Sequence, residues 1–152
     1  MVNFGLYWFV LEIKHLDFCG WGNGYVLIPK KHPWYGVDYD MLPVHIHGGL
    51  TFSEFFQTNY IEEWLSNKDI VGDINLDNYK KFENYWMIGF DTAHLNDNKI
   101  NCSKYYVIDE TKKLLEQCLN DSFEDIKIYK NIMTRNDKLI KIASVLALSS
   151  KQ

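Results

Sequence analysis

The stretch "NYWMIGFD" (84–91) is a nearly unbroken run of aromatic and aliphatic residues, and it predicts a central β-strand. A polar segment, "TAHLNDNKINCS" (92–103), follows it and is typical of a loop. The clearest helix of the chain comes next, at 104–120, "KYYVIDETKKLLEQCLN". One apolar stripe of this helix carries Val107, Leu114, Leu115 and Cys118. A buried strand, a polar loop and an amphipathic helix therefore follow one another over 84–120.

Shorter runs of the same kinds lie upstream of this unit. Strands are predicted at 3–13 and 25–29, and another begins at 44 and breaks at Gly48-Gly49. The segment 30–43 between them holds two prolines, a glycine and three aromatics, which indicates a long ordered loop. Residues 67–83 are polar and are also expected to be a loop.

Helices are predicted at 53–66, with Ser53 as N-cap, and at 136–149. Together these elements predict an α+β fold with one central, mainly antiparallel sheet of four or more strands, two or three packed helices and long loops. The length of 152 residues suits a single domain, 1–152. Residues 121–152 are expected to form a C-terminal helical extension.

Composition excludes several classes of protein. The net charge is −4 and Arg135 is the only arginine, so a basic face for duplex nucleic acid is not expected. No apolar run reaches the roughly 18 residues that a membrane span needs, and the start lacks the pattern of a signal peptide. The three cysteines form no CxxC pair, which favours reduced thiols in a cytoplasmic protein.

Polar residues gather where two predicted strands end. His47 stands at the end of one strand, while Asp91 and His94 follow another, so the three side chains would converge if both strands are central. Two imidazoles and a carboxylate are a recognised metal-binding set, and the same groups bind phosphate and ribose. His32 and Asp38 of the long loop would lie nearby. The plainer interpretation is that each residue only braces a turn or a sheet surface.

Four motifs, in order, resemble a family of small proteins widespread in bacteriophages and prophages. They are "NGYVLIPKKHPWYGVDYD" (23–40), "HGGLTFS" (47–53), "GFDTAHLNDN" (89–98) and "YVIDETKKLLEQ" (106–117). The resemblance places His47 inside the second motif and His45 outside it. It also places Asp97 in the third motif, with Asn96 where the family often has glycine.

The resemblance implies a protein made in the cytoplasm of an infected host, and the best expectation is immune evasion. Such an anti-defence protein would act as a sponge for a nucleotide immune signal, a cyclic oligonucleotide or an ADP-ribose derivative. Aromatic rings would stack on the base, Gly48 and Gly49 amides with Lys30 or Lys31 would hold phosphate, and polar groups would orient the sugar. The expected ligand-binding residues are His32, Trp34, Tyr35, Asp38, Tyr39, His47, Gly48, Gly49, Thr51, Asp91 and His94.

Two alternatives stay open at the level of sequence. The first is a phosphoester or nucleotide hydrolase that uses His47, His94 and Asp91, with or without a metal ion. The second is a protein-binding inhibitor without a small-molecule ligand. No cofactor is expected and no residue is assigned as a metal ligand. A homo-oligomer is compatible with the sequence.

Overall fold

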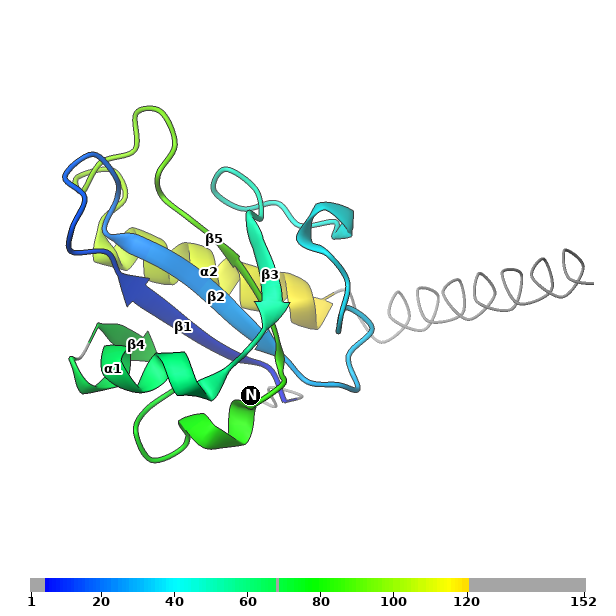
Figure 1. Cartoon of the computed structure of the whole chain (residues 1–152). Helices are drawn as coiled ribbons and strands as arrows, with labels where there is room; N and C mark the ends of the chain where they lie inside the picture. The colour runs from blue at the N-terminus through cyan, green and yellow to red at the C-terminus, as the bar shows by residue number, and fades with distance from the viewer. Residues whose placement is uncertain (1–4, 68, 121–152) are drawn as a thin grey trace, which may run out of the picture. The chain divides into compact units, whose positions relative to one another are not determined.

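A single antiparallel sheet organises the described part of the chain, which is residues 5–67 and 69–120 of the computed structural model. Within it five strands pair in the order β3-β5-β2-β1-β4 (Figure 1). Their bounds are β1 Tyr7–Glu12, β2 Gly22–Ile28, β3 Phe52–Phe55, β4 Ile70–Gly72 and β5 Trp86–Phe90. Two α-helices, α1 (Ile61–Ser66) and α2 (Lys104–Asn120), and short 3₁₀ turns at Tyr39–Met41, Thr58–Tyr60 and Tyr79–Phe82 complete it. This confirms the predicted α+β class.

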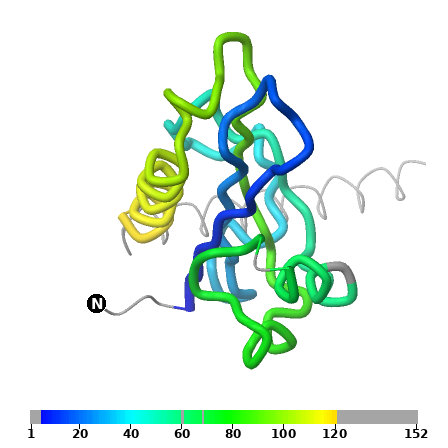
Figure 2. Tube along the Cα trace, turned by 90° about the vertical axis from the view of Figure 1, so that its left-hand side faces the viewer, coloured from blue at the N-terminus to red at the C-terminus, as the bar shows by residue number. Residues whose placement is uncertain are grey.

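Helix α2 covers one face of the sheet (Figures 1 and 2). Its buried Thr111 lies directly over Gly24 of β2, where a β-carbon would overlap the threonine hydroxyl. Val26 and Ile88 point to the same face as Gly24, because alternate residues of paired strands share a side. Val26, Ile88 and Phe90, which pairs with Gly24, are all buried, so this half of the core is tightly packed.

The opposite face of the sheet has an aromatic core. Phe9 and Leu27 pack there against Ile61 of α1 and Phe82 of the third 3₁₀ turn. The rings of Phe9 and Tyr25 stack with centroids 5.0 Å apart. This face also carries the pocket described below.

The prediction of a strand at 44–47 is wrong. The backbone of His45 bonds to a side chain instead: its N–H donates to Gln117 Oε1 at 2.8 Å, and Gln117 Nε2 donates to its carbonyl at 2.9 Å. The carboxamide of α2 thus takes the place of a neighbouring strand and ties the segment to the helix.

The prediction of a helix over 53–66 is wrong for its first half. Residues Phe52–Phe55 form β3, which pairs with β5 from Phe52 opposite Gly89 to Phe55 opposite Trp86. Apolar residues spaced for a helix also suit a short strand, and the pairing with β5 decides the outcome. Ser53 is not an N-cap, because its Oγ accepts the Tyr39 N–H at 3.0 Å. Only 61–66 is α-helical.

Two further boundaries differ from the sequence prediction. β2 begins at Gly22 rather than at 25, and glycine suits this position because a side chain there would overlap the Leu11 carbonyl of the paired strand. The expected loop 67–83 contributes β4 and a 3₁₀ turn. The predictions for 84–91 and 104–120 are confirmed. The predicted helix 136–149 and the extension 121–152 lie outside the described residues.

In the described residues, none of the helices has the length and apolar character needed to cross a bilayer.

Candidate functional site

The loop that leaves β5 is anchored at the end of the sheet. Thr92 is buried, and its hydroxyl donates to the Gly22 carbonyl at 2.7 Å. The Gly20 N–H donates to the Thr92 carbonyl at 2.7 Å, and the Trp21 N–H donates to the Cys102 carbonyl at 2.7 Å. The loop is therefore fixed at both of its ends to the turn between β1 and β2.

A tight turn within this loop brings Asp97 under His94. The Asp97 N–H donates to the His94 carbonyl at 2.9 Å, and the His94 N–H donates back to Asp97 Oδ2 at 3.0 Å. Asn96 accommodates the turn with a φ of 74°, in the left-handed region that asparagine tolerates. His94 Nδ1 then lies 3.0 Å from Asp97 Oδ2.

His47 reaches the same carboxylate from a second turn. Its Nε2 lies 3.0 Å from Asp97 Oδ1 and 2.9 Å from Oδ2. The chain turns here because Gly49 N–H donates to the Ile46 carbonyl at 2.9 Å, with φ of 64° at Gly48 and 78° at Gly49. Gly48 also packs on the His94 ring so closely that a β-carbon would overlap it. The Gly-Gly pair thus allows His47 and His94 to come close to each other.

Tyr106 of α2 completes the arrangement. Its hydroxyl lies 2.7 Å from His47 Nδ1, and the two rings meet edge to face with centroids 5.4 Å apart. Burial and the nearby Glu110 carboxylate raise the pKa of Tyr106, so the phenol stays protonated at neutral pH. We call His47, His94, Asp97 and Tyr106 the histidine cluster.

The carboxylate at the centre of the cluster is ionised. Burial alone raises the pKa of Asp97, but hydrogen bonds from His47 and from the backbone and ring of His94 outweigh it and hold the pKa at about 2. An ionised carboxylate only accepts, so His47 Nε2 and His94 Nδ1 both carry hydrogen. In a neutral His47 ring, Nδ1 then accepts the Tyr106 hydroxyl.

A buried thiol adjoins the cluster. Cys102 Sγ lies 3.8 Å from His47 Nε2. Burial and the Asp97 charge raise the pKa of the Cys102 thiol to about 11, so it is a poor nucleophile at neutral pH.

The sequence-predicted convergence of His47 and His94 is present, with ring centroids 5.4 Å apart. Asp91 is at the margin, with Oδ1 3.7 Å from His94 Nε2, while Asp97 is the carboxylate that both rings share. The spacing His-x-x-Asp at 94–97 is the sequence signal that could have pointed to Asp97.

The aromatic and polar residues of the long loop do not join the cluster. They follow β2 at the end where Ile28 pairs with Trp86, and the cluster lies beyond Phe90 at the other end of β5. His32 Nδ1 accepts the Trp34 N–H and its Nε2 lies 3.0 Å from the Cys118 carbonyl, so it links the loop to α2. The Tyr35 hydroxyl donates to the Asn84 carbonyl at 2.8 Å. Trp34 is buried, and Asp38 and Tyr39 are exposed.

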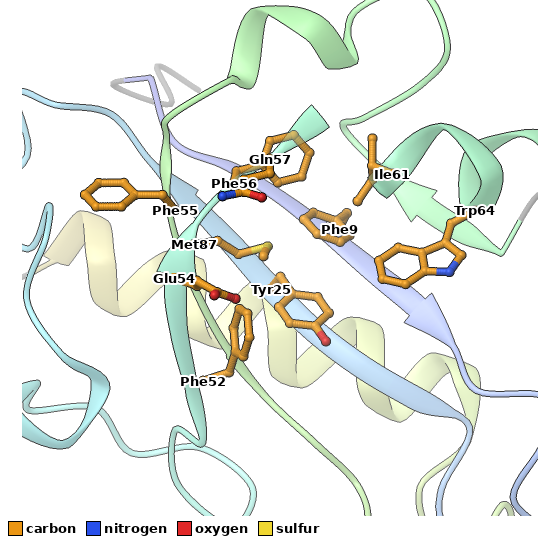
Figure 3. A pocket seen from close by; sticks show the side chains of 10 residues that line it. All are labelled: Phe9, Tyr25, Phe52, Glu54, Phe55, Phe56, Gln57, Ile61, Trp64 and Met87. Carbon is orange, nitrogen blue, oxygen red and sulfur yellow. The ribbon is translucent and has the colours of Figure 1, made fainter. Parts of the chain in front are cut away.

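A pocket of about 380 Å³ lies on the sheet face opposite α2 (Figure 3). No residue of the expected ligand-binding set lines it. We call it the aromatic pocket, and its lining consists of Phe9, Tyr25, Phe52, Glu54, Phe55, Phe56, Gln57, Ile61, Trp64 and Met87. These residues come from β1, β2, β3, α1, β5 and the segment between β3 and α1, and most resemble ordinary core positions in the sequence.

A second cavity, of about 150 Å³, adjoins the aromatic pocket. It shares Tyr25 and Phe52 with the aromatic pocket and is also lined by Asn23, Thr51 and Asp91. Asp91 in turn lies beside His94. Two residues of the expected ligand-binding set, Thr51 and Asp91, therefore lie between the aromatic pocket and the histidine cluster.

Comparisons with protein-family models, curated proteins and solved structures give no match for this chain.

Proposed function

We propose that this chain is a phage counter-defence protein that binds a nucleotide immune signal and withholds it from the host. The observation that carries the proposal is the aromatic pocket, whose volume and apolar lining suit a small ligand. The choice of a cyclic oligonucleotide or ADP-ribose derivative as the ligand rests on the resemblance of the sequence motifs.

The pocket walls favour a flat, aromatic ligand. The rings of Tyr25 and Phe52 meet edge to face at 82° with centroids 5.7 Å apart, and both line the pocket. Trp64 lies on the other side, with 40% of its surface exposed (Figure 3). Stacking of a base on such rings contributes about 1–3 kcal/mol per base.

Polar groups at the rim suit the edges of a nucleobase and a sugar. The Glu54 carboxylate accepts hydrogen bonds from amino and ring N–H groups, and the Gln57 carboxamide both donates and accepts. Asp91 and Thr51 in the adjoining cavity suit ribose hydroxyls. None of the described side chains that line either cavity is cationic, so the ligand's phosphates would face solvent.

The test is to recover the ligand from protein produced in cells that carry a nucleotide-signalling defence. Purified full-length protein is heat-denatured, and the released small molecules are identified by mass spectrometry. Wild type is expected to release an intact nucleotide, and Trp64→Ala and Phe52→Ala are expected to release at least fivefold less. Phe18→Ala is the matched control, because Phe18 is 89% exposed and lines neither cavity.

A direct measurement of nucleotide affinity complements the release experiment. ADP-ribose and a cyclic dinucleotide are titrated into each purified variant by calorimetry. Equal release and equal affinity in wild type and Trp64→Ala would reject the pocket as the site. Release of no nucleotide by wild type, together with no binding of either probe, would reject the sponge and favour the protein-binding inhibitor.

A second candidate, the phosphoester or nucleotide hydrolase, is favoured by the orientation of His94. Its Nδ1–H donates to the ionised Asp97, which leaves the lone pair on Nε2, in a side chain that is 35% exposed. A carboxylate that orients an imidazole in this way is typical of a general base. Cleaved rather than intact nucleotide in the release, with loss of cleavage in His94→Gln, would establish this function in place of the sponge.

A further inference from the structure

We propose that His47, His94 and Asp97 bind one divalent first-row transition-metal ion of the zinc class. The proposal concerns a site that the sponge does not need, and it stands or falls separately from nucleotide binding. Imidazole nitrogen is a preferred ligand of zinc and its neighbours, and two histidines with one carboxylate occur in catalytic sites that keep further positions open for water.

The ligand atoms are already close together. One atom from each of the three side chains lies within 4.8 Å of the others. His47 Nε2 is 2.9 Å from Asp97 Oδ2, and His94 Nδ1 is 3.0 Å from the same oxygen. Ligand bonds of about 2.1 Å in a tetrahedron place ligand atoms ~3.4 Å apart. Small side-chain rotations therefore suffice to admit an ion.

The distal nitrogen of each histidine faces an oxygen atom. His47 Nδ1 lies 2.7 Å from the Tyr106 hydroxyl, and His94 Nε2 lies 3.7 Å from Asp91 Oδ1. Metal-bound histidines donate their second N–H to an oxygen, which fixes the tautomer and the ring orientation. When the ion binds, the proton of each neutral ring moves to its distal nitrogen, so no net proton is released. The Tyr106 hydroxyl changes from donor to acceptor.

The site is partly open to solvent. A recess of about 450 Å³ lies beside His47 and is also lined by Glu110 and Lys113. The side chain of His94 is 35% exposed, whereas that of Asp97 is 8% exposed. The exposure of His94 gives an ion access to the cluster, and the carboxylate that the ion meets is mostly shielded from solvent, which strengthens the attraction.

Metal binding and the general-base arrangement exclude each other. The hydrolase candidate above needs hydrogen on His94 Nδ1, and the metal site needs the lone pair of the same atom. A metal-loaded protein therefore cannot use the His94–Asp97 pair as its base.

The test measures metal binding without any nucleotide. Full-length protein is stripped with a chelator and dialysed against Zn²⁺ at micromolar concentrations, and Co²⁺ is used as an optical probe of coordination. Wild type is expected to take up about one ion per chain. His47→Gln, His94→Gln and Asp97→Asn are expected to lose it, with folding checked by circular dichroism. His45→Gln is the matched control, because His45 is an exposed histidine two residues from His47.

If the ligand variants do not fold, Tyr106→Phe and Asp91→Asn test the metal site instead. Both keep the three ligands and are expected to weaken binding by about tenfold to hundredfold. The proposal is overturned if wild type takes up no ion, if His45→Gln loses the ion as the ligand variants do, or if neither Tyr106→Phe nor Asp91→Asn changes the affinity. Nucleotide release by wild type is unaffected by any of these outcomes, so failure here is distinct from failure of the sponge.

Discussion

The histidine cluster and the aromatic pocket hold their side chains in different ways. In the cluster, Asp97 is 8% exposed and accepts hydrogen bonds from two imidazoles and a backbone N–H. In the pocket, the rings contact one another by packing, and Trp64 keeps 40% of its surface exposed. Polar groups that satisfy one another are costly to separate, whereas an open ring is available to a partner. We therefore expect changes in the cluster to lower stability and changes in the pocket to lower ligand binding.

The largest effect is expected from Asp97→Ala. The substitution leaves the hydrogens of two partly buried imidazoles and the His94 N–H without their acceptor, so we expect the free energy of unfolding of metal-free protein to fall by about 3 kcal/mol. Urea denaturation followed by circular dichroism measures it. Asp91→Ala is the control and should change stability by less than about 0.5 kcal/mol. Equal losses of free energy of unfolding in the two variants would show that Asp97 stabilises the fold no more than Asp91 does.

The contribution of Asp97 to stability should depend on pH in the acid range. The pKa of Asp97 is lowered from 3.8 to about 2 in the folded protein, so its contribution to stability is complete above the unfolded value and is lost as pH falls through about 2. The difference in free energy of unfolding between wild type and Asp97→Asn, both metal-free, should shrink by about 2 kcal/mol between about pH 5 and about pH 2. A difference that stays constant with pH would mean that the two histidines do not stabilise the ionised form.

The glycine pair allows a finer comparison within the cluster. Gly48 and Gly49 both have positive φ, but only Gly48 has the His94 ring where a β-carbon would lie, and Gly49 has no atom within 4 Å of that position. Both alanine variants should lose about 1 kcal/mol from backbone strain, and Gly48→Ala should lose at least about 1 kcal/mol more. Thermal unfolding of the two variants under one condition measures the difference. Matching losses would show that His94 moves aside freely.

The smallest effect on stability is expected in the pocket. Trp64→Ala removes a ring that is partly exposed, so the free energy of unfolding should fall by no more than about 1 kcal/mol, while nucleotide affinity falls at least fivefold. Chemical denaturation and calorimetry on the same preparation give both values. A large loss of stability with unchanged affinity would reverse the comparison and make the pocket part of the core.

Local patterns predicted the elements that have strong sequence signals of their own. The strand at 84–91 and the helix at 104–120 are dense and regular, and both are present. The predictions of a strand at 44–47 and of a helix at 53–57 are wrong because partners distant in sequence decide the conformation of these segments. Gln117 bonds to the backbone of His45, and β5 pairs with 52–55.

The sequence likewise predicts only part of the candidate site. His47 and His94 could be placed together because each stands at a chain reversal near the end of the sheet. The local pattern does not predict Asp97 as a site residue. Its side chain reaches His94 only through the turn at Asn96, and that turn requires a positive φ at Asn96. The sequence does not reveal the aromatic pocket, because its residues come from six parts of the chain and most of them are apolar, as core residues are.

The two outermost strands of the sheet are β3, with four residues, and β4, with three. Long, exposed outer strands are templates on which further chains polymerise, and short ones offer few backbone groups for such growth. Glu54 places a negative charge on β3, which further opposes the addition of another copy there. Because β3 also contributes Phe52, Glu54 and Phe55 to the aromatic pocket, protection of this border from aggregation also protects part of the pocket wall when the protein is concentrated.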